Sequence, residues 1–308
     1  MLFASITSNI ASVVHGKPEA IELAVICLLA EGHLLIEDVP GVGKTSLAKA
    51  LATSIECSWK RVQFTPDLLP TDLVGVSVFH RSTESFTFQP GPLFANIVLA
   101  DEINRASPKT QSALLEAMEE RQVTADGHSH PLPRPFMVAA TQNPVEQEGT
   151  YRLPESQLDR FLMRLSLGYP GRDAELAILD THGSSRAIDE LQSVVSVAEV
   201  EAMSAAVRAV HLAAPLKAYL VDLAETSRRH PGLALGLSPR ATLQLARATR
   251  SRAAASGREF ATPDDTKAVA IPVLAHRVLI RPEAHARGLD GVAAIHEILS
   301  TVPVPTGR

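Results

Sequence analysis

The chain has 308 residues, of which 45% are hydrophobic and 20% are charged, and its net charge is −5. These values are typical of a globular protein, and this length suits one large domain or two smaller ones. The acidic balance and the aromatic content of only 4% argue against a protein that tracks nucleic acid.

Cys27 and Cys57 lie far apart without the spacing of metal ligands, so we expect two reduced thiols rather than a disulfide. The first residues have neither a basic region nor a long apolar core, which argues against a signal peptide. No apolar run reaches the roughly 18 residues of a membrane helix. We therefore expect a cytoplasmic protein without a membrane segment.

The first landmark is a short apolar strand over 34–36, preceded by a helix over 18–30. A turn with proline and two glycines follows the strand, and a helix over 45–52 follows the turn. This order is the P-loop arrangement. The strict pattern has glycine where this chain has Asp38, a residue type that tolerates turn conformations better than most. The nucleotide-binding residues expected in this loop are Asp38, Val39, Pro40, Gly41, Val42, Gly43, Lys44, Thr45 and Ser46.

The chemistry of such a loop is phosphate binding. Its glycines allow backbone N–H groups to close around an anion, and the helix N-terminus adds unpaired donors and a positive dipole end. Lys44 can reach the β- and γ-phosphates, and the hydroxyl of Thr45 can ligate Mg²⁺. The sequence therefore predicts that the chain binds ATP and Mg²⁺.

The second landmark is an apolar strand over 96–102 that ends in two carboxylates. Functional groups gather at the carboxyl ends of strands in a parallel sheet. We therefore expect Asp101 to hold the Mg²⁺ shell through water, and Glu102 to orient and polarise the attacking water. An earlier strand over 58–64 and a hairpin of 76–79 with 86–88 lie between the two landmarks.

A strong helix over 108–121 and a turn at Asp126-Gly127 come next. His128 and His130 form a His-x-His pair at this turn; a metal site is conceivable there, but we expect an exposed turn. A third buried strand over 136–144 ends in polar residues, among which Asn143 could hydrogen-bond the γ-phosphate or the lytic water. Arg160, at the end of a helix over 154–161, cannot be distinguished by position from an ordinary surface arginine.

After Tyr169 the pattern becomes helical, with helices expected over 196–210, 215–229, 239–256 and 263–280. One of them carries an apolar stripe typical of a core, made of Leu216, Tyr219, Leu220 and Leu223. Ser238 and Pro239 begin another with a good N-cap and a proline at the first position.

Taken together, these stretches resemble the MoxR family of AAA+ ATPases. The matching stretches are EGHLLIEDVPGVGKTSLAKALA, VQFTPDLLPTDLVG, GPLFANIVLADEINRASPKTQSALLEAMEERQVT, PFMVAATQNPVEQEGTYRLPESQLDRFLMR and SPRA. The resemblance implies that Lys44 and Thr45 belong to Walker A and that Asp101 and Glu102 form Walker B. It also implies that Asn143 is sensor 1, that Arg160 is an arginine finger supplied to the neighbouring subunit, and that Arg240 is sensor 2.

The family's fold is an α/β P-loop core, with a parallel five-stranded sheet flanked by helices, plus a C-terminal all-helical lid. We accordingly expect the core over 1–168, a linker over 169–190, the lid over 191–302 and a loose tail over 303–308. The segment 76–90 is similar to the helix-2 insert of this clade, and the family places backbone groups near His15 and Gly16 against the adenine.

The resemblance further implies a homo-oligomeric, hexameric ring and a chaperone-like role in maturing or assembling protein complexes. The usual partners are proteins with von Willebrand factor A domains. The chain departs from the family at Lys17, where glutamine is usual, and at Arg152, where proline is usual.

Two other functions use the same fold. A nucleic-acid motor or loader is disfavoured by the net charge of −5. A nucleotide-switched scaffold with little turnover is disfavoured by the presence of Glu102, Asn143 and Arg160. A motor subunit of the magnesium-chelatase type is closely related to the ring ATPase that remodels other proteins, and the sequence separates these two functions poorly.

Overall fold

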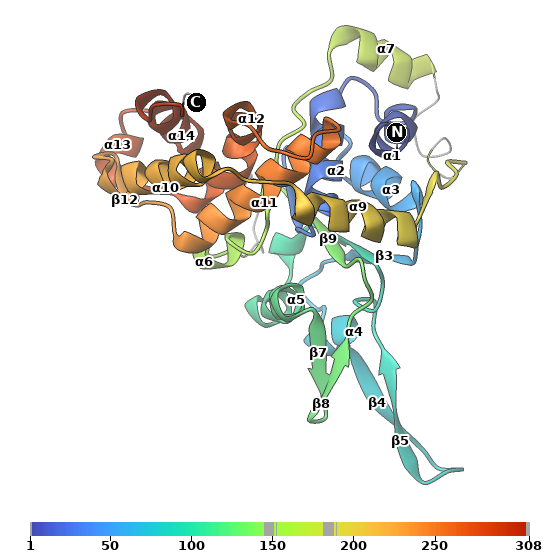
Figure 1. Cartoon of the computed structure of the whole chain (residues 1–308). Helices are drawn as coiled ribbons and strands as arrows, with labels where there is room; N and C mark the ends of the chain where they lie inside the picture. Colours follow the sequence, from blue (N-terminus) through green and yellow to red (C-terminus); the bar gives the residue numbers. More distant parts are fainter. Residues whose placement is uncertain (1, 145–150, 152, 181–187, 189, 306–308) are drawn as a thin grey trace. The chain divides into compact units, whose positions relative to one another are not determined.

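The computed structural model describes residues 2–144, 151, 153–180, 188 and 190–305, in which helices alternate with short strands (Figure 1). The chain divides into two compact units. The first contains Met1–Val25, His33–Arg160 and Leu165–Glu201, and the second contains Ile26–Gly32, Phe161–Arg164 and Ala202–Arg308. Within the described residues, no helix is both long enough and apolar enough to cross a membrane.

A five-stranded parallel sheet flanked by helices organises the α/β part of the chain, as expected from the sequence. Its strand order is β10-β1-β9-β6-β3. The strands are β1 (Leu34–Glu37), β3 (Trp59–Gln63), β6 (Ile97–Asp101), β9 (Met137–Gln142) and β10 (Met163–Leu165). Every residue of β6 is buried, because a central strand of a parallel sheet is covered on both faces.

In the first unit, helix α5 begins where the sequence places a capping residue. Ser107 caps α5 with its hydroxyl, and proline follows in the first turn. The helix α3 packs against β6 and β9. The helices are α1 (Leu2–Ala11), α2 (Pro18–Leu29, which continues into the second unit), α3 (Lys44–Thr53), α4 (Pro70–Val74), α5 (Pro108–Glu120), α6 (Glu155–Leu158), α7 (Arg172–Asp180) and the 3₁₀ turn η1 (Ile103–Arg105).

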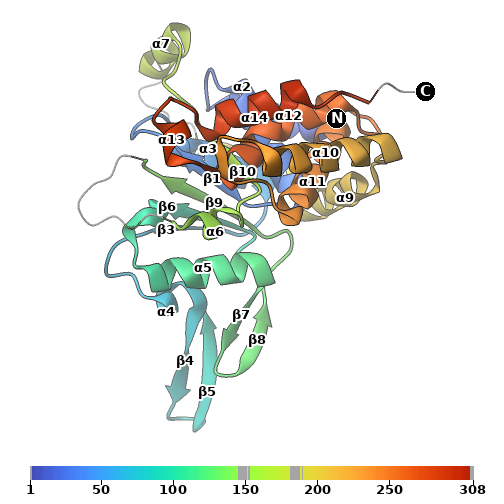
Figure 2. The ribbon, with the colours of Figure 1, turned by 90° about the vertical axis from the view of Figure 1, so that its left-hand side faces the viewer.

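Two hairpins extend from the same side of the first unit (Figures 1 and 2). The expected insert over 76–90 is the hairpin of β4 (Gly75–His80) and β5 (Ser85–Pro90), in which Phe79 faces Phe86. The turn expected at Asp126-Gly127 joins β7 (Gln122–Ala125) to β8 (His128–Pro131). His130 is not in an exposed turn: it lies on β8 and stacks on Phe88 at 4.1 Å between ring centroids.

The boundary between the units differs from the expected linker over 169–190. The short strand β11 (Val195–Ser196) pairs with β2 (Ile55–Glu56). The first unit therefore extends to Glu201, beyond the end of the expected linker. In addition, α7 forms inside the segment expected as a linker. Local sequence does not report such a long-range strand pair. Arg152 and the last residues of the expected tail, 306–308, lie outside the described residues.

The second unit is helical, as expected. Its elements are α9 (Val197–Ala209, which begins in the first unit), α10 (Ala214–Arg229), β12 (Leu233–Leu235), α11 (Pro239–Ala255), α12 (Pro263–Leu274), η2 (Ala275–Arg277), β13 (Leu279–Ile280), α13 (Pro282–His285) and α14 (Gly291–Thr301). The predicted apolar stripe of α10 is buried, and Ser238 caps α11. The last predicted helix ends at Leu274 rather than at 280, since β13 pairs with β12.

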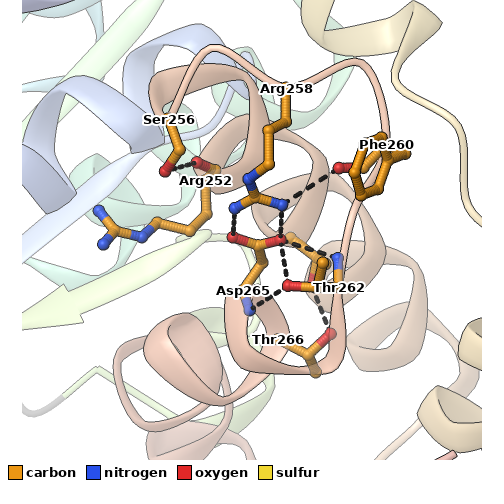
Figure 3. Close-up of polar contacts among 8 residues, drawn as sticks. Arg252, Ser256, Arg258, Phe260, Thr262, Asp265 and Thr266 are labelled. Carbon is orange, nitrogen blue, oxygen red and sulfur yellow. Dashed lines mark hydrogen bonds and ion pairs between the residues drawn. The ribbon is translucent and has the colours of Figure 1, made fainter. Parts of the chain in front are cut away.

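One ion pair fixes the start of α12 (Figure 3). Both guanidinium NH groups of Arg258 bond the carboxylate of Asp265, one of them at 2.7 Å. The same carboxylate accepts hydrogen bonds from the backbone N–H and the hydroxyl of Thr262, each at 2.8 Å, in a capping box. Burial raises the pKa of Asp265, but the bonds from Arg258 and Thr262 outweigh burial and hold the pKa below its ordinary value.

Candidate functional site

The phosphate loop lies between β1 and α3. The backbone of Gly43 has φ of 92°, a left-handed conformation that glycine adopts without strain, and α3 begins at the next residue, Lys44. The first N–H groups of α3 therefore have no intrahelical acceptor and face the loop. A helix start of this kind favours an anion such as a phosphate.

Strand register brings the polar strand ends together. Gln63 at the end of β3 pairs with Asp101 at the end of β6, and Ala100 pairs with Ala140, so that Thr141 of β9 is the next neighbour. Asp101 is only 3% exposed. Its Oδ1 atom accepts hydrogen bonds from Thr45 Oγ1 at 3.0 Å and from Thr141 Oγ1 at 3.1 Å.

A cavity of about 430 Å³ opens over these strand ends. This volume lies within the usual range of small-molecule sites, about 300–1,000 Å³. Most of the residues predicted from the sequence line it, namely His15, Pro40, Gly41, Val42, Gly43, Lys44, Thr45, Ser46, Asp101, Glu102 and Asn143. Asp38, Val39, Gly16 and Arg160 are not among the described residues of the cavity wall.

Glu102 has a strained backbone, with φ of 55° and ψ of 50°. Non-glycine residues adopt this region rarely, and such strain clusters at functional sites. Its Oε2 atom accepts hydrogen bonds from Gln63 Nε2 at 3.0 Å and from an NH group of Arg105 at 2.9 Å. Its backbone N–H donates to Thr141 Oγ1 at 3.0 Å, so both ends of the residue are held at the cavity wall.

Lys44 is held by the loop that carries it. Its ammonium donates to the carbonyl oxygens of Asp38 and Gln142, the latter at 2.9 Å. Burial lowers the pKa of Lys44, while the carboxylates of Asp38, Glu102, Asp101 and Glu37 oppose this effect only in part. The result is a partly desolvated ammonium at the wall of the cavity, where it can bind an anion strongly.

Asp38 has a different environment from the one expected of a phosphate-binding residue. Its Oδ2 atom accepts three hydrogen bonds, from Ser166 Oγ at 2.7 Å, Leu167 N at 2.7 Å and Gly168 N at 2.6 Å. Burial raises the pKa of Asp38, but these bonds together with that from Val39 N outweigh burial and hold the pKa below its ordinary value. Its carboxylate therefore fixes the segment after β10.

Sequence reasoning missed two residues of the cavity wall, Arg61 and Gln63. Both lie on β3, two residues apart, and therefore on the same face of the strand. The guanidinium Nε of Arg61 lies 2.7 Å from Asp101 Oδ2. The available signal was the presence of two polar side chains at alternate positions of a predicted strand.

The two arginines expected from the resemblance lie in different units. Arg160 pairs with Glu119 of α5, with 3.1 Å between Nε and Oε2, and its side chain is 27% exposed. Arg240 belongs to the second unit, in the first turn of α11.

Comparison with known proteins agrees with this arrangement. Residues 33–163 match the model of the ATPase family associated with various cellular activities (AAA), and residues 225–298 match the AAA lid domain. Over 308 aligned residues, the chain is 38% identical to Chaperone MoxR1 of Mycobacterium tuberculosis, with 96% of this chain and 81% of the relative covered.

Two further relatives extend the comparison. Protein MoxR of Methylorubrum extorquens is 34% identical, with 96% of this chain and 93% of the relative covered. A crystal structure from Cytophaga hutchinsonii, presented as that of a candidate ATPase, is 36% identical with a TM-score of 0.90 and covers 99% of this chain and 95% of its own. The chain therefore belongs to the MoxR family of AAA+ ATPases, and its chemical activity is the hydrolysis of ATP.

Proposed function

We propose that this ATPase is a Mg²⁺-dependent, ring-forming motor that remodels, matures or assembles partner protein complexes. The observation that carries the proposal is the cavity in which the phosphate loop, Asp101, Glu102 and Asn143 converge. Such convergence of donors, carboxylates and a helix N-terminus suits phosphoryl transfer, where catalysis is mostly positioning and electrostatic stabilisation.

The donor set fits magnesium. Thr45 and Asp101 present oxygen atoms that lie 3.0 Å apart at the cavity wall, and hard cations prefer oxygen ligands. Magnesium keeps several waters and is bound through few protein groups plus substrate phosphates. Thr45 and Asp101 are thus the residues that would hold it, and when bound it neutralises charge on the phosphate oxygens.

Glu102 is the residue that we assign to the attacking water. Its carboxylate reaches the cavity and is oriented by Gln63 and Arg105, which donate to the same oxygen. The second carboxylate oxygen can therefore accept a proton from water, the role of a general base. We propose that Asn143, which follows the neighbouring strand β9 and lines the cavity, bonds the same water or the terminal phosphate.

Arg160 is the group that we assign to a neighbouring subunit. It is not part of the described wall of its own cavity, and its pair with Glu119 fixes it on the surface of the first unit. A cation supplied to another subunit's phosphate contributes about 10³ to 10⁵ in rate. A homo-oligomeric ring, which we propose to be hexameric, would make hydrolysis depend on contact between subunits. Arg240 of the second unit is proposed to sense the bound nucleotide.

We propose that the partner on which this motor acts is a protein rather than a nucleic acid. The net charge of −5 gives the chain no overall basic excess for phosphate tracking, and one relative bears the name Chaperone MoxR1. We propose a protein with a von Willebrand factor A domain as the partner. Stimulation of hydrolysis by DNA or RNA, and not by protein, would favour the nucleic-acid motor instead.

A mixing experiment tests the proposed ring. Glu102→Gln supplies Arg160 but cannot activate water, whereas Arg160→Ala retains Glu102 but supplies no finger. Each variant alone should bind ATP with hydrolysis reduced at least about 100-fold, and a mixture of the two should recover part of the activity. Glu119→Gln is the control, because it breaks the same ion pair and keeps Arg160. A mixture that stays inactive although both variants bind ATP would contradict the proposal.

A further inference from the structure

Lys17 lies at the wall of the nucleotide cavity, yet its ammonium is directed to backbone carbonyls. It donates to the carbonyl oxygens of three consecutive residues: Leu167, Gly168 at 3.0 Å and Tyr169 at 2.8 Å. An ammonium has three N–H donors. All three are therefore used by this segment, and Lys17 is not placed as a second phosphate-binding lysine.

The carboxylate of Asp38 binds the hydrogen-bond donors of the same segment. It accepts from Ser166 Oγ and from the N–H groups of Leu167 and Gly168, at 2.6–2.7 Å. The N–H groups of Leu167 and Gly168 thus donate to the carboxylate of Asp38, which can only accept. Their carbonyl oxygens accept from the ammonium of Lys17, which can only donate. Charge-assisted bonds of this kind are stronger than neutral ones.

A close contact joins Gly16, the residue before Lys17, to the side chain of Ala174, which follows the segment. Gly16 has φ of 72°, and a Cβ atom at this position would lie 2.6 Å from the Cβ of Ala174 on α7. Only glycine fits such a contact. The turn that carries His15 and Lys17 is therefore packed against the chain that follows β10.

These contacts hold the part of the cavity wall that is apolar. The residues that line it fall into two groups: the phosphate loop with the polar strand ends, and an apolar group made of Val13, Val14 and Pro170 next to His15. Pro170 directly follows the held segment, and His15 lies two residues before Lys17. The apolar group is the part of the wall suited to a nucleoside base, because it offers contact area rather than charge.

We propose that Lys17 and Asp38 are positioning residues that clamp Ser166, Leu167, Gly168 and Tyr169, and thereby set nucleotide affinity and base selectivity without touching the phosphates. This inference rests on the proposed nucleotide site. It assigns Asp38 a role outside phosphate binding, and it assigns a role to Lys17, at which the chain departs from the family's usual glutamine.

The test compares a ligand that has a base with one that has none. Binding of ATP, GTP and inorganic tripolyphosphate is measured by calorimetry for the whole chain, for Lys17→Met and for Asp38→Asn. Lys17→Met should weaken ATP binding about tenfold and reduce the preference for ATP over GTP, while tripolyphosphate binding stays within about twofold. Lys17→Arg should restore part of the ATP affinity, since it keeps the charge and the donors.

The control is Lys60→Met, an exposed lysine on β3 with the same charge change, which should bind all three ligands as the wild type does. Retained tripolyphosphate binding also proves that a variant's phosphate loop is folded. ATP and tripolyphosphate binding that both stay unchanged, or that weaken equally, would overturn the clamp. Failure of the wild-type chain to bind either ligand would instead overturn the nucleotide site itself.

Discussion

Arg61 Nε lies 2.7 Å from Asp101 Oδ2, and both residues line the nucleotide cavity. The arginine side chain is 56% exposed, whereas the aspartate is buried among Thr45 and Thr141. Asp101 is also the carboxylate that we assign to the magnesium shell. A guanidinium at its second oxygen therefore competes with the magnesium ion that we propose for this site.

Replacing Arg61 should make the metal easier to bind. We expect Arg61→Gln to lower the Mg²⁺ concentration for half-maximal ATP hydrolysis about two- to fivefold, because ion pairs with an exposed partner contribute about 1 kcal/mol or less and the Arg61 side chain is 56% exposed. Titration of hydrolysis with Mg²⁺ at saturating ATP measures the effect. Lys60→Gln, on the same strand with the same charge change, is the control. An unchanged or higher Mg²⁺ requirement in Arg61→Gln would show that the arginine does not oppose the cation.

Removing Lys44 should abolish nucleotide binding. Its ammonium lies in the cavity wall on the carbonyls of Asp38 and Gln142 and is partly desolvated. We expect Lys44→Ala to weaken ATP binding at least about 100-fold, because a charge-assisted bond to phosphate contributes about 1.5–3 kcal/mol and more than one is lost. Lys49→Ala, one turn and a half further along α3, should bind ATP normally. Equal affinity of Lys44→Ala and the wild type would remove this lysine from the site.

The ion pair of Asp265 and Arg258 predicts how stability depends on pH (Figure 3). The pKa of Asp265 is lower in the folded chain than its ordinary value of about 3.9, so its contribution is fully present above that value and is lost as the pH falls below it. At pH 7, Asp265→Asn should destabilise the second unit by about 1.5–3 kcal/mol, since it removes the charge from the hydrogen bonds that Arg258 and Thr262 make to this side chain.

Urea unfolding at pH 7 and at pH 3 measures this difference between Asp265→Asn and the wild type. The difference should shrink at the lower pH, because the carboxyl of the unfolded wild type, with its ordinary pKa of about 3.9, is mostly protonated at pH 3 and the stabilisation from Asp265 is then reduced. Asp264→Asn is the neighbouring control, because its side chain is exposed and its effect should be a few tenths of a kcal/mol. A penalty for Asp265→Asn that is equal at both pH values would contradict the assigned linkage.

Local sequence was sufficient to predict the elements and functional residues that lie together in one continuous segment. The phosphate loop from Pro40 to Ser46, and the carboxylates at the end of β6, lie at the cavity as their patterns predicted. In the second unit, α9, α10 and α11 lie close to their predicted ranges, and Ser238 caps α11. In these cases one segment carries both the structural signal and the functional group. Helix α14 (Gly291–Thr301) was not predicted.

Long-range contacts explain what sequence could not predict. Arg61 and Gln63 reach the site only because β3 pairs with β6. The sequence of one strand does not predict which strand pairs with it. Asp38 bonds a segment about 130 positions later in the chain. The boundary near 201 depends on the pairing of β11 with β2, again between distant segments.

The central claim is that hydrolysis needs Arg160 from a neighbouring subunit. The most direct measurement is Mg²⁺-dependent ATP hydrolysis against protein concentration for the wild type, Arg160→Ala and the control Glu119→Gln. We predict that the specific activity of the wild type and of the control rises steeply with concentration, whereas Arg160→Ala binds ATP and stays inactive throughout. Specific activity that is independent of concentration well below the assembly threshold, or that survives in Arg160→Ala, would contradict the claim.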